Sequence, residues 1–148
     1  MKKTDIAVQI IKEDIENKIV LEVACGSADF SISASEYAGT VHCIDLDDTR
    51  LKGQTLQCAY FSVMDASEMS FPDSSFDTVV LYNAFFHIHT QWLDVEKECM
   101  RVLKEEGKII IISTWTLESG IITETFGERA QWDGEFLIVK IKKYSFNR

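Results

Sequence analysis

Short apolar runs alternate with helical patterns along most of the chain. Five mainly apolar runs have strand length: 18–24, 40–45, 59–64, 78–82 and 108–113. Continuous apolar strands, without strict alternation of polar and apolar residues, are typical of strands covered on both faces. Helical patterns between them predict right-handed crossovers. The pattern therefore predicts a Rossmann-like α/β fold with an open, mostly parallel sheet and helices on both faces.

Helices are expected between these runs. The clearest spans 92–103, where apolar residues recur at steps of three and four, and Gly107 is expected to end it as a C′ glycine. A first helix over 6–15 could be capped by Thr4 or Asp5. A second helix is expected over 29–38 and a short helical turn over 48–52.

The last third of the chain has a different pattern. Segments 121–126 and 135–143 look strand-like, and a polar loop over 127–134 joins them. Such a pair predicts an antiparallel hairpin at one edge of the sheet. Between Ser113 and Glu135 the chain looks too short for a full helix and a strand of ordinary length. Lid elements over a binding site are therefore expected to be largely missing from a compact fold.

Composition narrows the possible partners. The chain has 148 residues, with 15 Lys and Arg against 24 Asp and Glu, which gives a net charge of −9. This balance argues against nucleic acid and against an anionic membrane surface. A single domain over 1–148 is expected. Four cysteines without a C-x-x-C pair, no apolar leader and no membrane-length apolar run predict a soluble, cytoplasmic protein with reduced thiols.

The most informative stretch is 21–30, where a strand ends in a small-residue turn before a helix. Small residues such as Gly26 let the backbone approach a ligand, and a helix start offers unpaired N–H groups. Nineteen residues after Gly26, the second strand ends at Asp45. A carboxylate about 20 residues after such a turn is placed to hold a ribose diol. The two features together predict a cofactor that contains a nucleoside.

Further motifs follow in a fixed order. They are EVACGSA at 22–28, CIDL at 43–46, MDA at 64–66, FPDSSFD at 71–77, FFHI at 85–88 and RVLKEEGKIIII at 101–112. With these motifs the chain resembles the class I S-adenosylmethionine-dependent methyltransferases, most closely the branch of quinone-biosynthesis and other small-molecule methyltransferases. The resemblance covers about 18–113.

The resemblance implies roles for ten residues in binding S-adenosyl-L-methionine. Around the methionine portion it places Glu22, Ala24, Cys25 and Gly26. Asp45 would take the ribose hydroxyls and Leu46 would pack on adenine, while Asp65 and Ala66 would read the adenine edge. Leu81 and Tyr82 would face the methionine end and the acceptor.

Several residues have structural alternatives. Asp45 could be a loop carboxylate and Asp65 a turn former. His87 could accept a proton or could be a packed or capping residue, so no catalytic residue is assigned. His87 and His89, spaced i and i+2 without further ligands, do not predict a metal site. Ala28 stands where the family usually has a third glycine, and its methyl could displace the following helix.

The expected activity is methyl transfer from S-adenosylmethionine to an unidentified acceptor, for which a small molecule is favoured. A missing lid could instead be supplied by a protein partner or by a second subunit in a homodimer. A non-catalytic cofactor-binding or interaction module is the main alternative. An NAD(P)-dependent oxidoreductase is less favoured, because a G-x-G-x-x-G turn would be expected and this turn has Gly26 alone.

Overall fold

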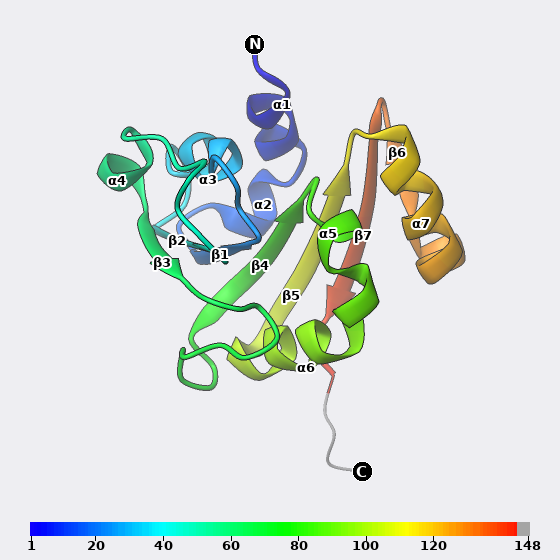
Figure 1. Cartoon of the computed structure of the whole chain (residues 1–148). Helices are drawn as coiled ribbons and strands as arrows, with labels where there is room; N and C mark the ends of the chain where they lie inside the picture. The colour runs from blue at the N-terminus through cyan, green and yellow to red at the C-terminus, as the bar shows by residue number, and fades with distance from the viewer. Residues whose placement is uncertain (145–148) are drawn as a thin grey trace.

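A seven-stranded sheet forms the centre of the structure, a computed structural model that describes residues 1–144 (Figure 1). The strand order is β3-β2-β1-β4-β5-β7-β6. Neighbours from β3 to β5 pair in parallel, and β7 pairs antiparallel with both β5 and β6. The strands are β1 (Ile19–Val23), β2 (Thr40–Asp45), β3 (Tyr60–Val63), β4 (Phe76–Tyr82), β5 (Leu103–Ser113), β6 (Gln131–Asp133) and β7 (Phe136–Lys142).

Helices cover both faces of the sheet. They are α1 (Lys3–Ile10), α2 (Lys12–Ile15), α3 (Asp29–Ala34), α4 (Thr55–Cys58), α5 (Phe85–Ile88), α6 (Trp92–Val102) and α7 (Thr116–Phe126), with 3-10 turns η1 (His89–Gln91) and η2 (Gly127–Arg129). Alternate residues of the central strands separate into two buried clusters. One packs against α1, α2 and α3, and the other against α5, α6 and α7. The predicted Rossmann-like fold class, including antiparallel C-terminal strands, is confirmed.

The hairpin differs from its prediction in one element. Residues 121–126 belong to α7, not to a strand, and the hairpin consists of β6 and β7. Ile122 and Phe126 are buried on one helical face together with Glu118 and Ser119. The stretch before Glu135 does not hold a full helix together with a strand of ordinary length, as expected: the eleven-residue α7 fits because β6 has only three residues.

Three local predictions are also corrected. Thr4 and Asp5 lie inside α1, and both bond to the Ser33 hydroxyl of α3 and do not cap a helix. Gly107 lies within β5, where an added Cβ would stand 2.9 Å from the Asp77 carbonyl oxygen. Residues 48–52 form a turn closed by a bond from the Leu51 N–H to the Asp48 carbonyl, and no helix lies between β2 and α4.

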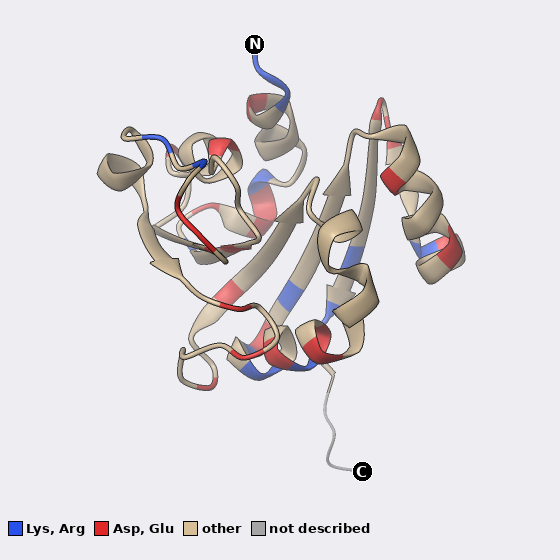
Figure 2. Cartoon of the chain, viewed as in Figure 1, with Lys and Arg blue, Asp and Glu red and all other residues tan. Residues whose placement is uncertain are grey.

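Charged residues are spread over the molecule, as Figure 2 shows for one view. Lys and Arg positions lie among Asp and Glu positions on several helices, strands and loops in this view. Asp14 of α2, mostly buried, pairs with Lys108 and Lys140 from two neighbouring strands. Within residues 1–144, no helix combines the length and the hydropathy needed to cross a bilayer.

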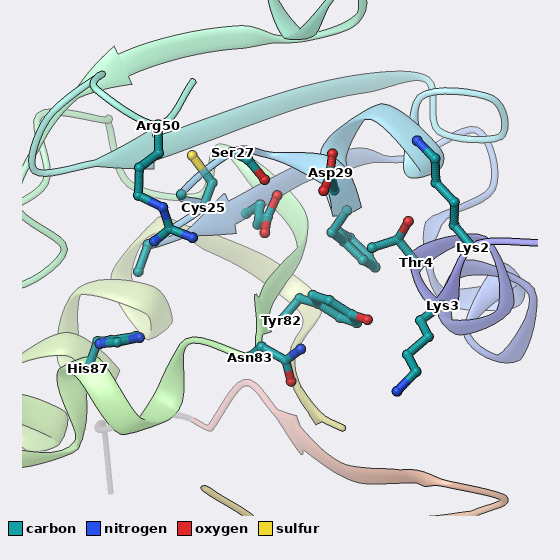
Figure 3. Close-up of a pocket in the computed structure, with 14 residues that line it drawn as sticks. Lys2, Lys3, Thr4, Cys25, Ser27, Asp29, Arg50, Tyr82, Asn83 and His87 are labelled. Atoms are coloured by element: carbon teal, nitrogen blue, oxygen red, sulfur yellow. The ribbon is translucent and has the colours of Figure 1, made fainter. Parts of the chain in front are cut away.

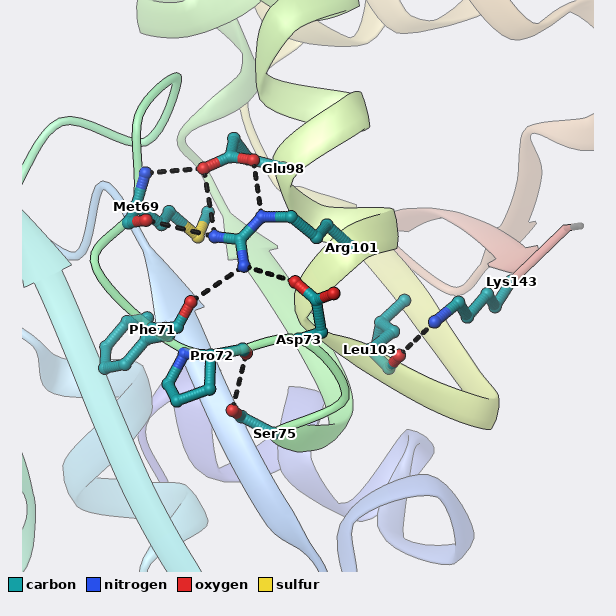
Figure 4. Close-up of polar contacts among 9 residues, drawn as sticks. All are labelled: Met69, Phe71, Pro72, Asp73, Ser75, Glu98, Arg101, Leu103 and Lys143. Carbon is teal, nitrogen blue, oxygen red and sulfur yellow. Dashed lines mark hydrogen bonds and ion pairs between the residues drawn. The ribbon is translucent and has the colours of Figure 1, made fainter. Parts of the chain in front are cut away.

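The loop before β4 is held by Arg101 of α6 (Figure 4). Its guanidinium donates to the Phe71 carbonyl and to Asp73 at 2.8 Å, and to the Met69 carbonyl at 3.0 Å. Glu98 accepts from Arg101 at 2.8 Å and from the Met69 N–H at 2.7 Å. One guanidinium thus holds the loop that leads from the end of β3 to β4.

We expect Arg101→Lys to lower the free energy of unfolding by about 1–3 kcal/mol, since an ammonium cannot reproduce the planar set of bonds. Urea denaturation measures this change. Arg129→Lys is the matched control, because the Arg129 guanidinium lies over the Phe126 ring, 5.2 Å from its centroid. Its effect should stay within about 0.5 kcal/mol. Equal effects of the two substitutions would show that the loop does not depend on Arg101.

Candidate functional site

Two adjoining cavities lie at the carboxyl ends of the parallel strands, where open α/β sheets bind ligands. Their volumes are about 410 and 300 Å³. Ala24, Arg50 and His87 line both, so the two cavities form one elongated cleft. Figure 3 shows the larger cavity, with Arg50 and His87 at one end and Lys2 and Lys3 at the other.

The structure brings together nine of the ten predicted site residues. The larger cavity is lined by Glu22, Ala24, Cys25, Gly26 and Tyr82. The smaller cavity is lined by Ala24 again and by Asp45, Leu46, Asp65 and Ala66. The exception is Leu81, whose side chain is fully buried in the apolar core, so the prediction that it faces the site is corrected. Its neighbour Tyr82 points to the other face of β4 and stacks on Phe30.

The turn after β1 has a left-handed backbone at every second residue. The φ angles are +55° at Ala24, +56° at Gly26 and +63° at Ala28. Only glycine adopts such angles without strain. Ala28 is fully buried directly before α3, where its methyl packs in the core. The sequence showed Ala28 as the departure from the family pattern, but Ala24 is a second alanine in the same strained conformation.

Asp45 holds this turn from the neighbouring strand. Its Oδ2 accepts from the Gly26 N–H at 2.7 Å, and its Oδ1 accepts from the Leu46 N–H at 2.7 Å. The carboxylate thus links the ends of β1 and β2 while remaining on the wall of the smaller cavity. Leu46, 70% exposed at the same wall, offers an apolar surface to a flat ring.

Glu22 is a buried carboxyl at the floor of the larger cavity. It is 2% exposed, and its Oε1 accepts from the Ser31 N–H at 3.1 Å and from the Ser31 hydroxyl at 2.7 Å. Burial raises the pKa of Glu22 well above its ordinary value. A cationic group in the cavity would stabilise the ionised form.

Asp65 begins the loop after β3 as a turn former. Its Oδ1 accepts from the Ser67 N–H at 2.9 Å and from the Ser67 hydroxyl at 2.7 Å, and these bonds lower the pKa of Asp65. Asp65 also lines the smaller cavity, so the turn role and a ligand role are compatible.

Asn83 and Arg50 are site residues that sequence reasoning did not assign to the cofactor. Asn83 holds the chain after β4 to Thr114 after β5, accepting from the Thr114 N–H at 2.8 Å. Arg50 comes from the turn after β2, and no motif marks it. Across residues 1–144, no group of three or more His, Cys, Asp or Glu residues is placed to hold a metal ion.

The arrangement suits an elongated ligand with a polar, cationic end and a nucleoside end. Glu22 lies under one end of the cleft, while Asp45 and Leu46 lie at the other. A carboxylate that can accept from a diol, beside an exposed apolar side chain, is a common means of holding a nucleoside.

Comparisons with known proteins identify the family of the chain. The family described as "Methyltransferase domain" matches residues 21–111. Among curated proteins, the demethylmenaquinone methyltransferase of Geobacillus is 29% identical over 109 residues, covering 67% of this chain and 46% of that protein. The 2-methyl-6-phytyl-1,4-hydroquinone methyltransferase of Synechocystis is 35% identical over 102 residues, covering 65% and 31%. The chain thus spans less than half the length of these two relatives.

Among solved structures, a SAM-dependent methyltransferase from Aquifex aeolicus superimposes with a TM-score of 0.69. Its sequence is 21% identical, and the match covers 92% of this chain and 88% of that one. At this identity the likeness concerns the fold.

The two strained alanines should respond differently to glycine. Ala24→Gly relieves the left-handed strain and should raise the free energy of unfolding by about 0.5–1 kcal/mol. Ala28→Gly relieves the same strain but removes a fully buried methyl, worth about 0.8 kcal/mol, so its net effect should be near zero. Urea denaturation compares the two. A loss of stability in Ala24→Gly would contradict the strain assigned to that residue.

Proposed function

Because this chain belongs to the methyltransferase-domain family, we propose that it binds S-adenosylmethionine and transfers the methyl group to a small-molecule acceptor. The observation that carries the proposal is the cleft with a carboxylate at each end, Glu22 under the larger cavity and Asp45 on the wall of the smaller one. The cofactor carries an ammonium group at one end and a ribose diol toward the other. The residues present fit both groups.

Each residue of the cleft has a definite task in this proposal. Glu22 receives the ammonium group, and Asp45 receives the ribose hydroxyls while it continues to accept from the Gly26 N–H. Leu46 packs on adenine, and the loop at Asp65 and Ala66 meets its edge. The bound cofactor supplies a methyl group already activated on a sulfonium. The protein's contribution is then to align the acceptor and to exclude water.

The acceptor is proposed to bind beside Tyr82 and His87. Both line the larger cavity, and His87 lies where the two cavities meet. An acceptor that must lose a proton before attack could transfer it to the His87 imidazole. The two relatives described above are named for menaquinone-type and hydroquinone acceptors, which supports a quinone-type small molecule here.

We further propose that the protein works in a reducing, cytoplasmic compartment. Cys25, Cys43, Cys58 and Cys99 are free thiols, which supports a reducing, cytoplasmic location. We also propose that a protein partner or a second copy of the chain completes the acceptor side of the cleft, by binding over residues 82–91 and the terminal hairpin.

Calorimetry with S-adenosylhomocysteine tests the cofactor assignment. Asp45→Ala should weaken binding by about ten- to a hundredfold, because charge-assisted bonds to both ribose hydroxyls are lost. Asp48→Ala, three residues further along, should leave affinity within about threefold, since it removes no carboxylate that lines the cleft. Asp45→Asn keeps an acceptor for the Gly26 N–H and separates loss of charge from loss of the turn.

Both Asp45 variants must first unfold cooperatively. Wild-type affinity in Asp45→Ala would contradict the ribose assignment. NAD in a parallel titration tests the oxidoreductase alternative. A protein that binds S-adenosylmethionine but transfers no labelled methyl group to quinol acceptors would support the non-catalytic alternative.

Glu22 should make the stability of the protein depend on pH. Because its pKa is raised on folding, Glu22 stabilises the native state most at low pH, and this contribution is lost as pH rises above the unfolded value. Glu22→Gln should therefore gain stability relative to wild type between about pH 4.5 and pH 8. Urea denaturation at both values measures the difference. A difference independent of pH would show that Glu22 is not perturbed.

A further inference from the structure

Arg50 extends from the turn after β2 to one end of the larger cavity (Figure 3). Its guanidinium lies directly over Gly26: a Cβ added to Gly26 would stand 3.1–3.3 Å from the guanidinium carbon and nitrogens. Arg50 also lines both cavities, together with Ala24 and His87. The guanidinium therefore occupies the junction of the two cavities, above the turn that the cofactor must cross.

The guanidinium of Arg50 makes no direct polar contact with the rest of the described chain. Within residues 1–144 the guanidinium takes part in no hydrogen bond and lies within 4 Å of no carboxylate oxygen. Lys52, two residues further along, behaves differently: its ammonium is bound to Asp29 at 2.6 Å. The bonds from Thr49, and at longer range the charge of Arg50, lower the pKa of the exposed Asp47 carboxyl. A cation that is directed into a ligand cleft without a direct contact partner is available to act on the ligand.

The position of the junction identifies the part of the cofactor concerned. In the function proposed above, on which this inference rests, adenosine lies in the smaller cavity and the methionine portion in the larger one. The sulfur joins these two portions and so would lie at the junction, beside Arg50. We propose that Arg50 is a specificity-determining residue that disfavours the cationic sulfonium of S-adenosylmethionine relative to the neutral thioether of S-adenosylhomocysteine.

This selectivity has a direct consequence for methyl transfer. The acceptor's lone pair forms the new bond to the methyl carbon, and the electron pair of the breaking S–C bond moves onto sulfur. Any proton that the acceptor carries leaves to a base. The positive charge on sulfur disappears during this step. A fixed cation next to the sulfur becomes less repelled as the transition state forms, so it raises the energy of the bound sulfonium more than that of the transition state.

Titration with three ligands tests the proposal: S-adenosylmethionine, S-adenosylhomocysteine and sinefungin, an analogue with a cationic amine in place of the methylsulfonium. Arg50→Gln should tighten binding of the two cationic ligands by about three- to tenfold relative to S-adenosylhomocysteine. The effect is moderate because Arg50 is exposed to solvent, and it should shrink as salt concentration rises. Calorimetry of the wild type and the variant supplies the three affinities.

Lys52→Gln is the matched control, since it removes a cation from the same turn that is already paired with Asp29. It should leave the ratio of the three affinities unchanged. If Arg50→Gln leaves this ratio unchanged, or weakens all three ligands equally, the proposal is overturned while the cofactor assignment stands. If the folded wild type binds none of the three, the proposed function itself fails, and this inference fails with it.

Discussion

The bond from the Gly26 N–H to the Asp45 carboxylate connects the wall of the larger cavity to the wall of the smaller one. It joins the turn after β1 to the end of β2, and these two strands pair in parallel over the whole of β1. The turn contains two alanines in a conformation that alanine disfavours, so its geometry must be imposed from outside. Asp45, the bond from the Cys25 N–H to Ile44 and the burial of Ala28 impose it.

Much of the fold could be predicted because the parallel strands are buried on both faces and therefore appear as continuous apolar runs. The α7 segment was mistaken for a strand because Ile121, Ile122 and Thr123 have β-branched side chains, which favour strands locally. Tertiary packing favours a helix here, because Ile122 and Phe126, four residues apart, are buried together on one helical face. The role of Thr4 depends on Ser33, 29 residues away, which no local pattern reveals.

The site was predictable where residues follow the ends of strands. Asp45, Asp65 and Tyr82 lie at the cleft because parallel strands end at one edge of the sheet. Leu81 was misassigned although a strand's period of two already separates it from Tyr82. Arg50 could not be found in this way. Its place over Gly26 depends on the course of a turn without regular structure and on the reach of a long side chain.

The left-handed alanines also bear on how the chain folds. An unfolded chain rarely samples such angles at Ala24 and Ala28, so the local sequence does not preform the turn. The turn can become stable only after β1 and β2 have paired and brought Asp45 to Gly26. The contacts of the turn are thus expected to form after the rate-limiting step of folding. Substitutions in the turn would then change the unfolding rate and leave the folding rate nearly unchanged. The protein would then bind a nucleoside only after the sheet has assembled. A chain that is still being synthesised would need both of its first two strands before it could retain a ligand.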